Sequence, residues 1–397
     1  MADDARTPVL INGARTPFAR FGGTLAPLSA TQLGAHAVRA ALVRSGVDPA
    51  AVEAVVIGQV IQAGARQGPA RQTGIHAGIG WDVPAVTVNK LCLSGLTAVI
   101  DAARLIRTGE AEVVVAGGQE SMTNAPHLLT GSRSPFGLGD RPLVDALNYD
   151  GLLDPFDELL MGTATDLGNA KRRIPRDRQD AFAALSHQRA EAARAAGVFA
   201  AQIEPIEVPQ SRGEAIVLGE DAGIRPEATA ETLARLRPAF SPDGTITAGS
   251  SSPLTDGAAA LVIASKAWAR AAGIEWLAEI GEPGQVAGPD GSLHSQPSAA
   301  ITRALRRAEL DLAALDVIEI NEAFASVVLQ SVDDLGIGTD RVNLDGGAIA
   351  IGHPVGASGA RLALHVAHAL HRRGGGTGVA ALCGGGGQGE ALILHAR

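Results

Sequence analysis

The segment Asp48-Pro-Ala-Ala-Val-Glu-Ala-Val-Val-Ile57 recurs later in the chain as Asp311-Leu-Ala-Ala-Leu-Asp-Val-Ile-Glu-Ile320. Each copy is typical of a helix end followed by a short strand rich in β-branched residues. Such self-similarity indicates an internal duplication, in which each copy supplies half of a larger core. The sequence therefore predicts two related α/β halves.

The similarity continues beyond these segments. Val88-Asn89 is echoed by Val342-Asn343, and each pair precedes a turn and a helix with one apolar face, the first ending near Gly109 and the second at Gly374. Each helix leads into an apolar strand that ends in glycine. Alternating strands and helices predict parallel or mixed sheets covered by helices, with functional groups at the carboxyl ends of the strands.

A polar stretch interrupts the first half. It runs from Ser121 to about Ser252 and contains a charged segment, 176–194, that predicts a helix. An apolar strand is then expected over 258–264. We interpret the polar stretch as an inserted surface subdomain that holds a ligand against the core.

Composition excludes several classes of protein. The 397 residues are 46% hydrophobic and 19% charged, which is typical of a folded globular chain. A net charge of −9 argues against nucleic-acid binding. No apolar run approaches the ~18 residues of a membrane span, so no membrane association is expected. Two cysteines are too few for a disulfide framework, and with no leader-like segment the cytoplasm is the expected location.

Cys92 lies between an expected strand end and the start of the first helix. The positive end of a helix dipole stabilises a thiolate and lowers the pKa of the thiol from about 8.5, which makes Cys92 a candidate nucleophile. The alternative is a buried, inert cysteine.

Cys383 ends an apolar strand and enters the glycine-rich segment 384–389. This segment matches the dinucleotide pattern G-x-G-x-x-G, but only eight residues follow Gly389, too few for the helix and strand that the motif requires. A glycine-rich turn next to a thiol instead exposes backbone N–H groups, as an oxyanion site would need. A buried cysteine before a tight turn remains the alternative.

His353 stands between Gly352 and Pro354 in a glycine-rich loop. Histidine can act as a base near neutral pH, so this placement favours a chemical role over the alternative of packing. Asn321 follows the expected strand 317–320 and could orient a water molecule or hold an oxyanion, although asparagine is also common at strand ends.

Three further histidines are spaced three residues apart, at positions 365, 368 and 371. On a helix this spacing rotates each side chain by about 60° from the last, so the three cannot easily bind one metal ion. We expect a solvated helix end there rather than a metal site.

Five motifs together resemble the thiolase family, and within it the acetyl-CoA C-acetyltransferases. They are VNKLCLSG (88–95), GGQESM (117–122), NEAF (321–324), GGAIAIGHPVGASGAR (346–361) and CGGGGQGEA (383–391). The resemblance implies duplicated βαβαβαββ halves in a five-layered αβαβα core with an inserted loop domain. The implied boundaries are 1–121 with 255–275 for the N-terminal half, 122–254 for a CoA-binding loop domain and 276–397 for the C-terminal half.

The resemblance also implies roles for individual residues. Cys92 would be the acylated nucleophile, His353 would activate it, and Cys383 would move the proton at the α-carbon of a second acetyl group. One oxyanion hole would combine His353 with a water held by Asn321, and the other the N–H groups of Cys92 and Gly385. The implied substrate and CoA contacts are Met161, Arg225, Leu236, Phe240, Ala248, Ser252, Ala323 and Phe324.

The implied reaction is reversible ping-pong acyl transfer that condenses two acetyl-CoA to acetoacetyl-CoA and CoA, or thiolyses a 3-ketoacyl-CoA. CoA would be substrate and product, with no tightly bound cofactor and no metal, in a homodimer or homotetramer. The alternatives are a longer-chain 3-ketoacyl-CoA thiolase of fatty-acid degradation, a decarboxylating ketosynthase and a non-catalytic protein that binds acyl-CoA or lipid. The sequence departs from the usual family pattern at Leu160-Met161-Gly162, at 286–297 and at 384–388, which leaves chain length and direction open.

Overall fold

The strands of both halves form one continuous mixed sheet in the computed structural model of the chain, which describes residues 2–210 and 212–397. The strands are β1 (Pro8–Arg15), β3 (Ala54–Gly58), β4 (Ala85–Val88), β5 (Val113–Glu120), β10 (Thr255–Ser265), β11 (Ala278–Ala287), β12 (Val317–Ile320), β13 (Gly376–Gly384) and β14 (Gln388–Ala396), with β2 (Ala19–Arg20) paired to β10. Their order is β12-β13-β14-β11-β1-β10-β5-β3-β4.

The pairing directions confirm the duplication. In the first half β3 runs parallel to β4 and β5, and β10 and β1 follow with antiparallel pairing. In the second half β12 runs parallel to β13, and β14 and β11 again follow antiparallel. The counterpart of β4 is reduced to a single parallel bridge between Ile318 and Val342, because the chain turns at Asn343, whose φ is 50°.

Helices cover both faces of each half-sheet. They are α1 (Ala2–Ala5), α2 (Ala30–Ser45), α3 (Pro69–His76), α4 (Ser94–Thr108), α8 (Lys266–Ala272), α9 (Gln296–Ala308), α10 (Ala325–Leu335), α11 (Ala348–Ile351) and α12 (Ser358–Arg372), with single turns of 3-10 helix at Pro49–Ala51, Leu312–Ala314 and Thr339–Arg341. Helix α4 ends at Gly109 in the left-handed conformation, as expected.

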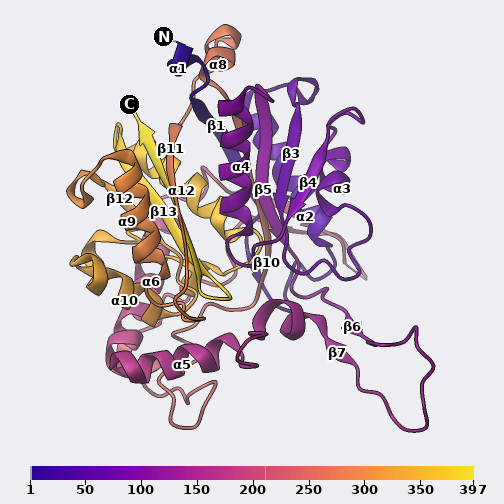
Figure 1. The fold of residues 1–397 in the computed structure, drawn as a ribbon, viewed down its shortest axis with the longest axis vertical. Helices are drawn as coiled ribbons and strands as arrows, with labels where there is room; N and C mark the ends of the chain where they lie inside the picture. Colours follow the sequence, from indigo (N-terminus) through magenta and orange to yellow (C-terminus); the bar gives the residue numbers. More distant parts are fainter. Residues whose placement is uncertain (1, 211) are drawn as a thin grey trace.

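The packed cores place these helices in layers (Figure 1). Leu96 and Ile100 of α4 and Leu364 of α12 share one core with the inner faces of both half-sheets. A second core joins α2 and α3 to the outer face of the first half-sheet, and a third joins α9 and α10 to the outer face of the second. The order is therefore helix, sheet, helix, sheet, helix, which confirms the expected αβαβα core.

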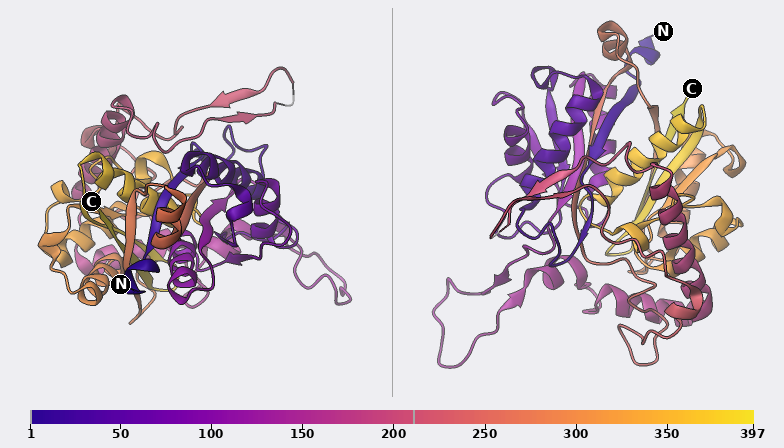
Figure 2. Two further views of the ribbon diagram at one scale, coloured as in Figure 1. Left: turned by 90° about the horizontal axis from the view of Figure 1, so that it is seen from above. Right: turned by 180° about the vertical axis from the view of Figure 1, so that it is seen from behind.

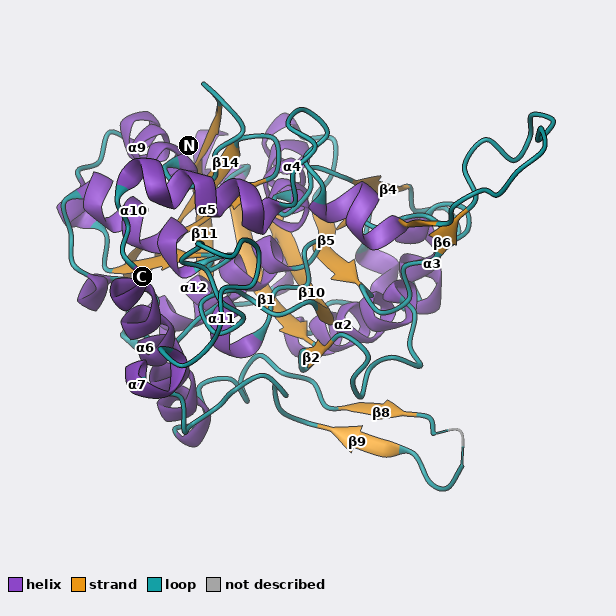
Figure 3. Ribbon diagram, turned by 90° about the horizontal axis from the view of Figure 1, so that it is seen from below, coloured by secondary structure: helices purple, strands orange, loops and turns teal. Residues whose placement is uncertain are grey.

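The polar stretch after β5 lies outside these layers. Its elements are β6 (His127–Leu128), β7 (Val144–Asp145), a π-helical turn at Leu147–Leu152, α5 (Met161–Arg172), α6 (Arg176–Ala195), β8 (Ile206–Val208), β9 (Ile216–Leu218) and α7 (Ala230–Leu233). The helix expected over 176–194 is thus present as α6. The loop between β6 and β7 and the β8–β9 hairpin extend away from the body (Figure 2). Helix α5 crosses the end of the molecule at which β5 ends and β14 begins (Figure 3).

The expectation of a solvated end for the three histidines of α12 is wrong for two of them. His365 and His368 are buried and only His371 is exposed, because α12 belongs to the central layer between the half-sheets. His365 Nε2 lies 3.2 Å from Asp345 Oδ2. Over residues 2–210 and 212–397, the structure contains no cluster of three or more His, Cys, Asp or Glu side chains suited to a metal ion. None of the helices described has the length and apolarity to span a bilayer.

Candidate functional site

A cavity of about 500 Å³ lies between the core and the inserted segment, and residues of both halves line it. Most of the side chains predicted as functional from the sequence line this cavity. These are Cys92, Met161, Arg225, Phe240, Ala248, Ser252, Ala323, Phe324, His353, Cys383 and Gly385. The two cysteines, which the duplication does not place at equivalent positions, therefore meet in one site with His353.

Asn321 and Leu236 are the two predicted residues that do not line the cavity. Asn321 is fully buried directly beside His353, with its Nδ2 3.4 Å from Nε2 and 3.5 Å from Nδ1 of the ring. Its Oδ1 is buried and has no hydrogen-bond partner among the described residues. Leu236 is 37% exposed, and its side chain packs against Gly249. The structure therefore places Asn321 next to the site and leaves Leu236 outside the lining.

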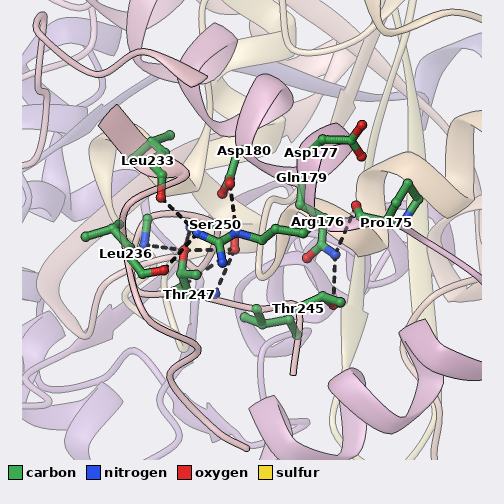
Figure 4. A network of polar contacts seen from close by, with 12 residues as sticks. Pro175, Arg176, Asp177, Gln179, Asp180, Leu233, Leu236, Thr245, Thr247 and Ser250 are labelled. Atoms are coloured by element: carbon green, nitrogen blue, oxygen red, sulfur yellow. Dashed lines mark hydrogen bonds and ion pairs between the residues drawn. The ribbon is translucent and has the colours of Figure 1, made fainter. Parts of the chain in front are cut away.

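The first turn of α6 anchors the segment that carries Leu236 (Figure 4). Arg176 Nη2 donates hydrogen bonds to the carbonyl oxygens of Leu233 at 2.8 Å and Leu236 at 3.0 Å, and its Nε donates to Asp180 at 2.7 Å. This segment is thus held by its backbone carbonyl groups.

The same helix turn holds the loop 245–252, which forms one wall of the cavity. Gln179 Nε2 donates to Thr245 Oγ1 at 2.9 Å (Figure 4). Further along, the hydroxyl of Thr247 accepts from the Gly249 N–H at 3.1 Å, and the Thr247 N–H donates to Ser250 Oγ at 3.0 Å. These local turns fix the backbone that presents Ala248, Ser251 and Ser252 to the cavity.

The loop around His353 fixes the position and the tautomer of its ring. Gly352 has a φ of 112°, and a Cβ there would lie 2.6 Å from Thr255, so no other residue fits easily. His353 Nδ1 lies 2.6 Å from Ser358 Oγ, and the Ser358 hydroxyl donates its hydrogen to the Pro354 carbonyl. With that hydrogen directed to Pro354, Ser358 Oγ accepts from Nδ1–H, and this tautomer leaves Nε2 unprotonated and able to act as a base.

Burial and, to a smaller extent, the nearby Arg361 guanidinium lower the pKa of His353 to about 3. The imidazole is therefore neutral at neutral pH. The unprotonated Nε2 can therefore accept a proton, but the lowered pKa makes it a weaker base than a free imidazole.

The prediction of a lowered pKa for Cys92 is wrong. Burial raises the pKa of this thiol to about 11, although its own N–H and the N–H of Gly385 act in the opposite direction. Helix α4 begins only at Ser94, so Cys92 precedes the helix end, and the loss of hydration outweighs the dipole. The thiol is thus protonated at neutral pH and requires a base for activation.

Cys383 is more deeply buried, with 1% of its surface exposed. Burial and the neighbouring Cys92 raise the pKa of the Cys383 thiol above that of Cys92. Beyond it the chain turns through Gly386 and Gly387, whose φ values are 68° and 63°. The N–H groups of Gly385 and of Cys92 itself act on the Cys92 thiol and favour its ionised form.

Glu390 connects the loop of Cys92 to the opposite half. Its carboxylate is fully buried, and it accepts hydrogen bonds from Lys90 Nζ at 3.0 Å, from Thr97 Oγ1 at 2.7 Å and from Gln285. Strand β14 thus holds both ends of the segment that carries Cys92.

Glu120 makes a second connection between the halves. Its buried carboxylate accepts from the N–H groups of Val60 at 2.9 Å, Ile61 at 3.2 Å and Gly356 at 3.1 Å. Gly356 belongs to the His353 loop. Burial raises the pKa of Glu120 to about 8, while these three donors act in the opposite direction.

Glu322 holds the segment 321–324, which carries Asn321, in place. It accepts from Ser186 at 2.6 Å, Asn343 at 2.9 Å and the Ile349 N–H at 3.0 Å. Like Glu120 and Glu390, it lies inside one of the quoted motifs. The motifs therefore included these three glutamates, but the sequence did not show which groups they bind.

Sequence reasoning also missed part of the cavity lining. The additional lining residues are Arg20, Met122, Asn148, Gly151, Leu152, Leu160, Gly162, Ala239, Ser251, Pro253, Leu254, Leu293, Val355 and Gly384. Most are apolar or small and come from segments far apart in the chain. No local pattern distinguishes them from core residues, so only the tertiary structure identifies them.

Comparison with known proteins agrees with this arrangement. Residues 8–267 match the family described as "Thiolase, N-terminal domain", and residues 274–396 match "Thiolase, C-terminal domain". A "Probable acetyl-CoA acetyltransferase" of Mycobacterium leprae is 55% identical, over 98% of this chain and 99% of the relative. One of Mycolicibacterium smegmatis is 54% identical, over 98% and 100%, and an "Acetyl-CoA acetyltransferase" of Cupriavidus necator is 45% identical, over 98% of both chains. The chain belongs to the thiolase family.

Proposed function

We propose that this thiolase transfers acyl groups between thioesters through Cys92, condensing two acetyl-CoA to acetoacetyl-CoA and CoA and running the reverse thiolysis. The observation that carries the proposal is the meeting of Cys92, His353 and Cys383 in one cavity, with the N–H groups of Cys92 and Gly385 at the Cys92 sulfur. The printed names of the relatives, acetyl-CoA acetyltransferases at 45% to 55% identity, support acetyl-CoA as the substrate.

The first half-reaction makes the acyl-enzyme. His353 Nε2 takes the proton of Cys92 as Sγ attacks the carbonyl carbon of acetyl-CoA. The bond between that carbon and the CoA sulfur breaks, and the departing sulfur takes the proton of Cys383. Free CoA leaves, and the enzyme holds an acetyl group on Cys92, a Cys383 thiolate and a protonated His353. Exchange of one thioester for another is nearly balanced in energy.

The second half-reaction forms the carbon–carbon bond. The Cys383 thiolate takes an α-proton from a second acetyl-CoA, and the resulting carbanion attacks the acetyl carbon on Cys92. The bond from that carbon to Cys92 Sγ breaks, and the sulfur takes back the proton from His353. Because its pKa is raised, the Cys383 thiolate is a stronger base than an ordinary thiolate, which suits abstraction from a weak carbon acid.

Each oxyanion in this sequence needs fixed donors. The N–H groups of Cys92 and Gly385 are proposed for one, and His353 with a water held by Asn321 for the other. The partnerless, buried Oδ1 of Asn321 supports a polar ligand at that place. Removal of one such donor typically costs about 3 to 4 kcal/mol of barrier.

A single experiment tests the proposal. The protein is incubated with acetyl-CoA, and the adduct is located by peptide mass spectrometry. We expect an acetyl group on Cys92, and its absence from Cys92 would leave the alternative of a protein that only binds acyl-CoA. A thiolysis panel of acetoacetyl-CoA against longer 3-ketoacyl-CoAs then separates an acetyl-specific enzyme from a longer-chain thiolase of fatty-acid degradation.

We also propose a homo-oligomer, a homodimer or homotetramer. Strand β4 ends the sheet and exposes 53% of Val86, and the loop between β6 and β7 exposes Leu138 and Leu143. Such uncovered apolar side chains on a sheet edge and a projecting loop favour contacts between copies. Sedimentation analysis measures the number of copies. Two unbridged cysteines support the cytoplasm as the location.

A further inference from the structure

The charges around the cavity contrast with those of the whole chain. The protein carries a net charge of −9, yet the described residues that line the cavity include two arginines, Arg20 and Arg225, and no aspartate or glutamate. Arg225 is exposed, whereas Cys383 is buried. Arg225 therefore lies on the solvent side of the cavity, whereas Arg20 is half-buried in its wall.

Arg20 is held in place but largely without partners. It lies in β2, where it pairs with Thr255 of β10, so its backbone is fixed on the central sheet. Its Nη2 donates to the Gly223 carbonyl at 3.1 Å. Its Nε is buried and has no hydrogen-bond partner, and no carboxylate in the described chain forms an ion pair with it. A buried donor of this kind is costly unless a ligand satisfies it.

The groups around Arg20 do not neutralise it. Burial and the neighbouring Arg225 lower the pKa of Arg20, and the exposed Glu227 opposes this without forming an ion pair. His187 Nδ1 accepts the Arg225 N–H at 3.2 Å, and burial with the two arginines lowers the pKa of His187 to about 4. His187 is therefore neutral, and it holds the backbone of Arg225 beside Arg20.

Two neighbouring guanidinium groups that form no ion pair with a carboxylate of the described residues suit a multiply charged anion. Arginine binds phosphate oxygens through paired N–H donors, and it retains its charge when partly buried. CoA carries a diphosphate and a 3′-phosphate at the end remote from its sulfur. We propose, on the basis of the proposed function, that Arg20 binds a phosphate of CoA together with Arg225 at the mouth of the cavity.

The test compares substrates with and without phosphates. Arg20→Gln is assayed with acetyl-CoA and with acetyl-pantetheine, which lacks both the diphosphate and the nucleotide. We expect the KM for acetyl-CoA to rise about tenfold with kcat nearly unchanged, because a charge-assisted hydrogen bond is lost. The KM for acetyl-pantetheine should not change. An equal rise for both substrates, or no rise for either, would overturn the role of Arg20.

Matched variants and a binding measurement complete the test. Arg303→Gln makes the same change of charge at an exposed position on α9 and should leave both KM values unchanged. Arg20→Lys keeps the charge and should restore part of the affinity. Acetyl-dephospho-CoA, which lacks only the 3′-phosphate, shows which phosphate Arg20 contacts. If Arg20→Gln still raises the KM for this substrate, the contact is to the diphosphate. If the KM no longer rises, the contact is to the 3′-phosphate.

Calorimetry of CoA binding gives the same answer without turnover. Arg20→Gln should weaken CoA binding about tenfold. An unchanged CoA affinity of Arg20→Gln would refute the phosphate contact, even if the wild-type protein acylates Cys92. If instead Arg20→Gln weakens CoA binding but the wild-type protein never acylates Cys92, only the proposed function is refuted.

Discussion

The two cysteines of this chain occupy one cavity but differ in their surroundings. Cys92 is partly exposed, precedes a helix, and has two backbone N–H groups at its sulfur. Cys383 is 1% exposed at the end of a strand, in an apolar cluster with Leu293 and Phe324. Burial raises the pKa of both thiols, but more for Cys383.

This difference shows how one functional group can serve two purposes. The N–H donors near Cys92 stabilise negative charge on its sulfur. They also stabilise the charge that develops on the carbonyl oxygen of the acyl group that the sulfur attacks. The apolar surroundings of Cys383 disfavour its thiolate and so make that thiolate a strong base once it forms. Four experiments separate the two environments.

The largest effect is expected for Cys92→Ala. Because the sulfur that accepts the acyl group is lost, acetyl exchange between acetyl-CoA and free CoA should fall by at least about 10³-fold. Exchange is measured with isotopically labelled CoA. Retention of exchange within tenfold of the wild type would show that another group carries the acetyl.

Cys383→Ala should separate the two half-reactions, because it affects condensation more than acetylation of Cys92. Condensation should fall by at least about 10²-fold, since the base for the α-proton is removed. Acetylation of Cys92 should persist. It should be slower than in the wild type, because Cys383 no longer supplies a proton to the departing CoA; mass spectrometry over time measures the rate. Condensation at the wild-type rate would remove Cys383 from the mechanism and erase the contrast between the two cysteines.

The raised pKa of Cys92 predicts the pH dependence of its alkylation. With a pKa of about 11, the thiolate fraction rises about tenfold for each pH unit between 8 and 10. The rate with iodoacetamide should therefore climb over this range, with the label on Cys92 ahead of Cys383. A plateau near pH 8 would indicate that the helix end, rather than burial, controls Cys92.

Ser358→Ala should have the smallest effect. It removes the acceptor of His353 Nδ1–H and thereby loosens the tautomer that keeps Nε2 unprotonated. Acetylation of Cys92 should slow about tenfold. Ser326→Ala is the matched control, since its hydroxyl is buried with no partner among the described residues and lies outside the cavity lining. Equal rates for the two variants would argue against an orienting role for Ser358.

Much of the fold followed from local patterns. The repeated segments 48–57 and 311–320 end in β3 and β12, and the apolar face of 94–108 became α4, capped at Gly109 as expected. These features depend on periodicity and on glycine geometry, which act over a few residues. The position of Leu236 and the burial of His365 and His368 depended instead on which elements pack together.

By itself the sequence determined the duplication and the order of the motifs. It also identified the two cysteines and the histidine as the candidate reactive residues. Only the tertiary structure decided their chemistry. The pKa of Cys92 follows from burial by distant segments, and its loop is held by Glu390, which is 300 residues from its partner Lys90. Arg20 reaches the cavity through β2 and β10, far apart in the chain. Hydration and long-range contacts arise only on folding, so no local pattern encodes them.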